Sequence, residues 1–211
     1  MPQRSQAVLE PRKSPVQARS TASVEALLEA TIHVLLRVGK DRLTTTRVAL
    51  RAGVSVGTLY QYFPNKRALL QAALRRHLEQ VARAIENICR EQMGNSLEEM
   101  AAALIDAFLA AKMKDSKTSV ALYSVSSDVD GAKIALQVGL RGTKAIVAML
   151  ATAREPLTKD LQLIAWMLQG AMNGISRRLL ESEAPEKHVE PLRQELIFFV
   201  SAYLKACTES S

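Results

Sequence analysis

The chain has 211 residues and a formal net charge of +7, and 48% of its residues are hydrophobic. This hydrophobic content excludes a disordered protein, and the aromatic share of 4%, with 9 glycines and 7 prolines, favours helices over strands. No apolar run approaches a membrane span and no signal peptide is visible, so we expect a soluble, cytoplasmic protein. Cys89 and Cys207 lack metal-ligand spacing, so we expect neither a metal nor a cofactor.

The positive charge is unevenly distributed along the chain. Residues 1–90 contain 15 Lys and Arg against 6 Asp and Glu, whereas residues 91–211 contain 13 against 15. A basic N-terminal part joined to a nearly neutral remainder is typical of a phosphate-binding domain attached to a domain with another role. A surface that is basic only for solubility would explain the sign of the charge but not its position.

The N-terminus is predicted to be a disordered arm followed by a helix. Residues 1–19 are polar, basic and interrupted by three prolines. Such an arm can follow a DNA backbone or enter a minor groove, and a tail without a role is an equal alternative. The apolar stripe that follows predicts a helix from Thr21 to Val38, ended by Gly39.

Residues 45–66 have the pattern of two short helices joined by a glycine turn. We expect Thr45 to cap the first helix, and Gly53 to end it in the left-handed conformation that glycine adopts without steric cost. Ser55 is placed to cap the second helix, and Asn65 the helix after that. This is the arrangement of a helix-turn-helix, whose second helix lies in the major groove of DNA.

The second helix of this motif is expected to offer small and polar side chains to a partner. Gln61 and the methyl group of Thr58 can read base edges, and Gly57 suggests a close approach of the backbone. Hydroxyl groups and the ammonium group of Lys66, at a helix N-terminus, suit phosphates. For each tyrosine, an ordinary half-buried position is an equal alternative. The predicted DNA-binding residues are Thr45, Ser55, Val56, Gly57, Thr58, Tyr60, Gln61, Tyr62 and Lys66.

A long signature in this region resembles the DNA-binding motif of the TetR family of bacterial transcription regulators. It comprises Ala49, Ala52, Gly53, Val54, Ser55, Gly57, Thr58, Leu59, Tyr60, Tyr62, Phe63, Lys66 and Leu69. The resemblance implies two groups of DNA contacts. Those expected to touch phosphates are Thr45, Ser55, Thr58, Tyr60 and Lys66, and those expected to lie near bases are Val56, Gly57 and Gln61. Arg67 departs from the pattern, because an acidic residue often follows the lysine, and we expect it to add positive charge beside the DNA.

The rest of the chain is predicted to be helical. One long helix is expected from Asn65 to about Gln92, and further helices over 97–113, 117–126, 131–153, 157–181 and 188–208. The fold class is therefore all-α, with about nine helices. We expect a helix-turn-helix DNA-binding domain at residues 20–67 and a larger ligand-binding and dimerisation domain at residues 68–211.

The last two expected helices carry a dimerisation signal. Gly170 and Gly174 are four residues apart, which lets another helix approach closely. The final helix is apolar on more than one side and must bury more than one side. The resemblance implies a homodimer with a four-helix interface, and a purely intramolecular core is the alternative. The predicted dimerisation residues are Gly170, Gly174, Leu196, Phe199, Val200 and Tyr203.

A ligand cavity in the C-terminal part would be lined by apolar residues with a few polar groups that orient the ligand. For any single one of these residues, a position in the plain core is the stronger alternative. Asp106 lies in an almost wholly apolar helix and is either a solvated residue or a polar anchor. The predicted ligand-binding residues are Leu104, Phe108, Tyr123, Met149, Trp166, Met167, Gln169 and Asn173.

The sequence contains no nucleophile elbow, zinc-protease, P-loop or dinucleotide-binding motif, so we do not expect an enzyme. The leading hypothesis is a ligand-responsive transcription regulator, acting as a repressor. It would bind a near-palindromic operator as a homodimer and be released by a small apolar or amphipathic effector. One alternative is an effector-independent DNA-binding or architectural protein, and another is a helical enzyme or lipid carrier whose basic region is incidental.

Overall fold

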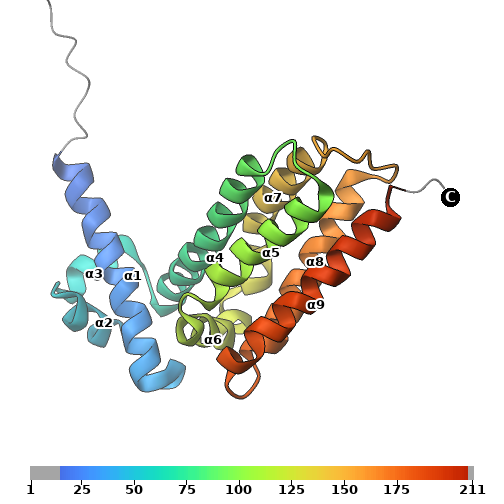
Figure 1. Cartoon of the computed structure of the whole chain (residues 1–211). Coiled ribbons are helices and arrows are strands. Elements are labelled where there is room, and N and C mark those ends of the chain that lie inside the picture. Colours follow the sequence, from blue (N-terminus) through green and yellow to red (C-terminus); the bar gives the residue numbers. More distant parts are fainter. Residues whose placement is uncertain (1–14, 209–211) are drawn as a thin grey trace, which may run out of the picture.

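The computed structural model describes residues 15–208, and this part of the chain contains nine α-helices, one 3-10 helix and no strand. The predicted all-α fold is therefore confirmed. Three helices form an N-terminal unit at one end of the molecule (Figure 1): α1 (Pro15–Arg42), α2 (Thr45–Ala52) and α3 (Val56–Tyr62). None of the described helices combines the length and apolarity that a bilayer span requires.

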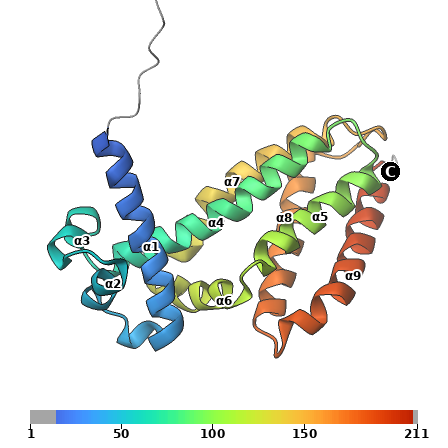
Figure 2. The same cartoon turned by 60° about the vertical axis from the view of Figure 1, so that its left-hand side comes forward.

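The remaining helices form a C-terminal bundle. They are α4 (Lys66–Glu91), α5 (Leu97–Met113), α6 (Ser116–Val125), α7 (Gly131–Leu150), α8 (Leu161–Leu180) and α9 (Pro185–Ala206), with the 3-10 helix η1 (Ser126–Val129) before α7. Helix α4 begins beside the N-terminal unit and runs along α7 (Figure 2). Helix α5 packs against both α4 and α9, and α8 lies beside α9.

Polar side chains define where several helices begin. Asn65 accepts a hydrogen bond from the Ala68 N–H at 2.9 Å and caps α4, as predicted. Ser96 and Glu99 form a reciprocal capping box at the start of α5, whose bounds agree with the predicted range. Local hydrogen bonding of this kind explains why the beginnings of α4 and α5 could be placed from the sequence.

The loop between α7 and α8 is longer than predicted. Helix α7 ends at Leu150 and α8 begins at Leu161, although helices had been predicted to reach 153 and to begin at 157. The Arg154 N–H donates to the carbonyl of Asn95 at 3.1 Å, and the Thr158 N–H donates to that of Cys207 at 2.9 Å. These long-range bonds satisfy the backbone in place of helical ones.

Helix α1 begins earlier than predicted. It starts at Pro15 rather than Thr21, so residues 15–19 of the expected disordered arm are helical, and residues 1–14 lie outside the described part of the chain. Proline is tolerated in the first turn of a helix, because its missing N–H would have no partner there. Gly39 interrupts the helix as predicted, with φ 74° and ψ 172°, and one further turn reaches Arg42.

The buried apolar side chains form two clusters, and α4 contributes to both. One cluster joins the N-terminal unit to α6, η1 and the start of α7 through residues such as Leu69, Val125 and Val138. The other fills the space between the far end of α4 and helices α5, α7, α8 and α9. The core of the N-terminal unit therefore continues past the predicted domain boundary at residues 67–68.

Candidate nucleic-acid interface

Helix α2 is capped by Thr44, and not by Thr45 as predicted. The hydroxyl oxygen of Thr44 accepts a hydrogen bond from the Arg47 N–H at 3.3 Å, and its backbone is extended. Thr45 is the first helical residue, and its hydroxyl lies 3.1 Å from the hydroxyl of Tyr60 on α3. The beginning of α2 is thereby tied to the middle of α3.

The turn between α2 and α3 has the predicted geometry. Gly53 adopts φ 70° and ψ 26°, the left-handed conformation in which a side chain would be strained. Its N–H donates to the carbonyl of Leu50 at 3.2 Å, and the Val54 N–H donates to that of Ala49 at 3.0 Å. The turn uses up carbonyl groups that the end of α2 would otherwise leave unpaired.

Helix α3 is held in place by a cap at its start and by apolar anchors along one side. The Ser55 hydroxyl accepts from the Thr58 N–H at 2.9 Å and lies 2.8 Å from the Thr58 hydroxyl. Leu59 and Phe63, four residues apart, are buried in the core of the N-terminal unit. These contacts confirm the predicted cap and anchors, and they leave the opposite side of α3 open.

The open side of α3 carries Gly57, Tyr60 and Gln61, all exposed, with Thr58 half-buried beside them. A methyl group at position 57 would meet only the Ser55 hydroxyl, at an ordinary contact distance of 3.7 Å. The fold itself therefore does not require a glycine there, and the room above this part of α3 is available to a partner.

Val56 and Tyr62 do not face away from the core as predicted. Both are half-buried and pack against the core of the N-terminal unit. Positions 56, 59 and 63 recur on one side of a helix, so Val56 shares the side of the buried Leu59. For Tyr62, the half-buried alternative is the correct one.

Two cations at the start of α4 are bound within the protein. The ammonium group of Lys66 donates to the Lys40 carbonyl at 2.5 Å. The guanidinium group of Arg67 pairs with Asp130 at 2.6 Å, so Arg67 does not add a free positive charge as expected. Lys40 in turn pairs with Asp128 at 3.0 Å. These contacts connect α1 and α4 to η1 and the residue that follows it.

Basic residues that the sequence analysis did not select border a groove between α1 and α2. This groove of about 910 Å³ is lined by Arg37, Arg47 and Arg51 together with apolar side chains, among them the exposed Leu50. Arg47 also donates to the Arg42 carbonyl at 2.6 Å. Arg47 and Arg51 are four residues apart on α2, and that spacing could have indicated a shared basic face.

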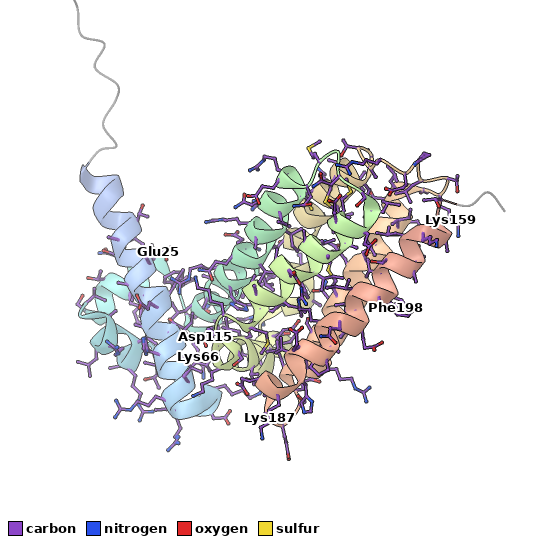
Figure 3. All side chains as sticks on the ribbon, viewed as in Figure 1. Glu25, Lys66, Asp115, Lys159, Lys187 and Phe198 are labelled. Carbon is purple, nitrogen blue, oxygen red and sulfur yellow. The ribbon has the colours of Figure 1, made fainter. Side chains whose placement is uncertain are left out.

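The outer faces of α8 and α9 carry large exposed apolar side chains. Gly170 and Gly174 are also exposed, with nothing within 4 Å of the place where a Cβ would stand. Phe198 is 71% exposed and lies on the outer edge of α9 (Figure 3). The outer apolar face, as we name this surface, consists of Leu163, Trp166, Met167, Phe198 and Phe199.

Part of the predicted dimerisation set lies inside the chain's own core. Leu196 and Val200 are each 1% exposed and belong to the cluster that α9 shares with α5, so neither is accessible to a second copy. Tyr203 is half-buried and packs against the same cluster, whereas Phe199 is exposed. Helix α9 thus has two apolar sides, as predicted, and Leu196 and Val200 lie on the side that faces the bundle.

The predicted ligand-binding residues do not converge on one cavity. Leu104, Phe108 and Met149 are buried in the core of the bundle. Trp166 and Met167 belong to the outer apolar face, and Asn173 is exposed. The Gln169 amide is used within the bundle, where it accepts from the Thr143 hydroxyl at 2.7 Å and donates to the Gly139 carbonyl at 3.0 Å. Of the set, only Phe108 and Tyr123 meet, at the buried Lys112.

Other polar groups of the bundle have structural roles. Asp106 accepts two hydrogen bonds from Arg193, at 2.5 and 2.8 Å, and so joins α5 to α9 as a polar anchor. Both cysteines are buried, and burial raises the pKa of the Cys89 thiol to about 12. Among residues 15–208, no group of three His, Cys, Asp or Glu side chains is arranged to hold a metal.

A capped helix-turn-helix on a helical bundle defines a class of DNA-binding regulators. Comparison with known families agrees with this class. Residues 27–73 match the family described as bacterial regulatory proteins, tetR family, and residues 96–204 match the tetracyclin repressor-like C-terminal domain. The chain belongs to the TetR family of transcription regulators and binds DNA, and the matched families are not enzymes.

Individual relatives match only part of this chain. The regulator BetI of Escherichia coli (strain UMN026) is 34% identical over 80 residues, which are 38% of this chain and 41% of BetI. The repressor KstR of Mycolicibacterium smegmatis is 44% identical over 55 residues, 26% of this chain and 27% of KstR. The matched segments thus span less than half of these relatives.

Solved structures share the whole fold. A TetR-family transcriptional regulator from Streptomyces coelicolor has a TM-score of 0.64 at 24% identity, with 88% of this chain and 99% of that chain covered. The fatty acid degradation regulator FadR from Bacillus halodurans has a TM-score of 0.61 at 18% identity, with 82% and 97% covered. At such identities the likeness shows the fold alone.

Proposed function

We propose that this TetR-family regulator is a ligand-responsive repressor. Two copies joined through α8 and α9 would place their α3 helices in successive major grooves of a near-palindromic operator. A small apolar or amphipathic effector, bound by residues 68–211, would favour a subunit arrangement with the wrong spacing. The coupling needs only a differential affinity of about 1–3 kcal/mol for the two arrangements.

The observation that carries the proposal is the exposed side of α3. Gly57, Tyr60 and Gln61 face solvent on a short helix that is fixed by a cap, a glycine turn and two buried anchors. We assign base contacts to Gln61 and Thr58, and phosphate contacts to Ser55 and to the linked hydroxyls of Thr45 and Tyr60. For Lys66 to contact a phosphate, its ammonium group has to exchange the hydrogen bond to the Lys40 carbonyl for one to DNA.

The outer apolar face supports the homodimer. Aromatic and other large apolar side chains from two neighbouring helices are exposed together there, which is uncommon on a monomer. The same pair of helices from a second copy would cover it, with Gly170 and Gly174 allowing close approach. In this dimer Trp166 and Met167 are interface residues rather than ligand contacts.

Repression is proposed from the relatives, because geometry does not distinguish it from activation. KstR is named a repressor, and BetI a regulator. A repressor needs no contact beyond the operator, since occupancy alone blocks transcription. The localisation proposed with this function is the cytoplasm, where the chromosome of a bacterium lies.

The test is a selection from random duplex DNA with the purified full chain, followed by footprinting. We expect a near-palindrome whose half-sites are one helical turn apart, about 34–36 Å, or a multiple of it. The affinity should fall steeply as salt is raised. Enrichment of no sequence, or binding of isolated half-sites by a monomer, would contradict the proposal.

The closed core of the bundle favours a second candidate, an effector-independent DNA-binding protein. Leu104, Phe108 and Met149, which were predicted to line a cavity, are each only 1% exposed in this structure. The two candidates differ in one measurement. Once the operator is known, compounds that bind the bundle are tested for release of the DNA. Release by one of them supports the ligand-responsive repressor. If none of them releases the DNA, the effector-independent protein is supported.

A further inference from the structure

Lys112 is a buried cation in the last turn of α5. It is only 2% exposed and is among the largest fully buried side chains of the described chain. Lysine is almost never fully buried unless it is paired, because removing an ammonium group from water is costly. Its burial therefore needs an explanation beyond ordinary packing.

The surroundings of Lys112 contain aromatic rings but no carboxylate partner. Its Nζ lies 5.8 Å from the centroid of the Phe108 ring and 5.2 Å from that of the Tyr123 ring. Within residues 15–208, the side chain makes no ion pair and no hydrogen bond, and its Nζ is not among the fully buried atoms without a partner, so the ammonium group keeps a narrow contact with solvent. Ring faces offset only part of the cost of burying a charge. The ammonium group therefore retains its capacity to bind an anion.

The polar groups of Ser119 and His77, which lie beside Lys112, are already hydrogen-bonded. The Ser119 hydroxyl donates to the Lys112 carbonyl at 2.9 Å, so its oxygen accepts from the Nε2–H of His77 at 3.1 Å. Burial lowers the pKa of His77 to about 4 and that of Lys112 to about 8. At neutral pH the imidazole is thus neutral and the ammonium group is mostly charged, so Lys112 is the cation of this cluster.

A groove lies beside this cluster and shares His77 with it, although Lys112 itself is not among the residues that line it. About 460 Å³ lie between α1, α4, α5 and α6, lined among others by His77, Ala111 and Thr118. His77 is the histidine on which the charge of Lys112 acts, and Ala111 directly precedes Lys112. The same groove is bordered by Glu29 and Ile32 of α1, so an occupant would touch the N-terminal unit as well as the bundle.

We propose that Lys112 binds the acidic group of the effector, and that the effector is a monocarboxylate with an apolar body. This inference rests on the proposed function and names the ligand class of its bundle. Among the buried groups of this cluster Lys112 is the one cation, which matches one negative charge, and the Phe108 and Tyr123 rings beside it match an apolar body. Arg177, a cation that acts on Tyr123, is already paired with Glu181 at 2.8 Å. The charged residues that line the groove, Glu29, Arg76, Lys114 and Asp115, balance one another, so a doubly charged group would lack a second partner.

The first experiment measures binding to the native full chain without DNA. Straight-chain, branched and aromatic monocarboxylates are each compared with their methyl esters by thermal shift and calorimetry. We expect at least one acid to bind saturably and about tenfold or more tighter than its ester, as a charge-assisted hydrogen bond provides. If no acid in the panel binds better than its ester, the inference is wrong.

The second experiment uses Lys112→Met, with the exposed Lys117→Met as the matched control. Met keeps the length of the side chain and removes its charge. For the acid that the native chain binds, we expect Lys112→Met to lose the preference over the ester and Lys117→Met to keep it. Without ligand, Lys112→Met should raise the melting temperature, because an uncompensated charge is removed. A lowered melting temperature with unchanged acid binding would identify Lys112 as a structural residue and overturn the inference.

The outcomes separate the inference from the proposed function. Release of the selected operator by neutral compounds, with no preference for acids, would leave the repressor intact and exclude the monocarboxylate. Lys112-dependent binding of an acid by a chain that selects no operator would establish the site and exclude its regulatory role. The comparison of acid with ester on the native chain stands even if Lys112→Met does not fold.

Discussion

The two ends of the molecule differ in how far their polar groups are exposed to solvent. At the surface, the hydroxyls of Ser55 and Thr58 bond to each other and that of Tyr60 bonds to the Thr45 hydroxyl, and water can replace each of these bonds. In the bundle, Lys112 and His77 are buried, so the cost of leaving either without a partner is larger. Substitutions on α3 should therefore change DNA affinity with little effect on folding, whereas substitutions in the buried cluster should change stability and ligand binding together.

The outer apolar face provides the largest expected effect. Phe198→Asp should produce monomers and weaken operator binding about 100-fold or more, because two half-sites are then no longer bound together. Light scattering and DNA titration check this result. Leu136→Asp, on α7 and 69% exposed, is the matched control and should leave both unchanged. A Phe198→Asp protein that remains dimeric would show that this face is not the interface.

The buried end can be tested through His77 and pH. Burial, followed by the charges of Lys112 and Arg76, lowers its pKa from 6.5 to about 4, and Asp115 opposes this only in part. The unfolded chain then binds more protons than the folded chain between pH 6.5 and 4, so stability is lost as pH falls through this range. We expect a loss of up to about 3 kcal/mol from this residue.

The measurement is denaturant unfolding of the native chain and of His77→Gln at several pH values. Glutamine keeps an N–H donor for Ser119 but does not titrate. The free energy of unfolding of the two proteins should therefore change with pH at the same rate above pH 6.5 and at different rates below it. The exposed His33→Gln should follow the native chain. Parallel curves for all three proteins would mean that His77 is not desolvated, and the contrast between the two ends would then be smaller than described.

On the surface end, Gln61→Ala should weaken operator binding by about 1–3 kcal/mol and relax the preference at one base pair per half-site. The free energy of unfolding should not change, since Gln61 is exposed. Arg51→Ala is the comparison variant, expected to weaken binding of all sequences equally and to reduce the salt dependence. Uniform weakening by Gln61→Ala would instead make Gln61 a phosphate contact.

Gly57→Ala should stabilise the protein slightly. Alanine in the middle of a helix stabilises by about 0.5–1 kcal/mol relative to glycine, so we expect at most this gain at Gly57, the second residue of α3, where the methyl group has room. We expect this gain in unfolding experiments together with weaker operator binding, because the methyl group would stand between α3 and the DNA. Unchanged DNA affinity would place position 57 outside the interface.

Local chemistry made the helix-turn-helix predictable from the sequence. Gly53, Ser55 and Asn65 act on their own backbone neighbourhood, and their positions therefore fix the turn and two caps. The cap of α2 was misplaced by one residue, because Thr44 and Thr45 are both suitable and only the three-dimensional path of the chain decides between them.

The sites of the bundle could not be predicted in this way. Both sides of α9 are apolar, and its sequence does not say that Leu196 faces α5 while Phe198 faces outward. Lys112 looks like a cation that favours the negative end of a helix, a common surface position. Its burial depends on how α4, which is distant in sequence, and α6, which follows at once, fold back on α5, and no local pattern carries that information.

The joint between Arg67 and Asp130 affects how DNA-binding experiments on this protein are interpreted. Both side chains of the pair are more than half exposed, so dissolved ions screen it. The apolar cluster between the N-terminal unit and the bundle is not screened in this way. Raising the ionic strength thus loosens this contact between α4 and the residue before α7 while it also releases the DNA. The number of phosphate contacts derived from the salt dependence of DNA binding would then include a contribution from this ion pair. The difference in salt dependence between the native chain and Arg67→Ala measures that contribution.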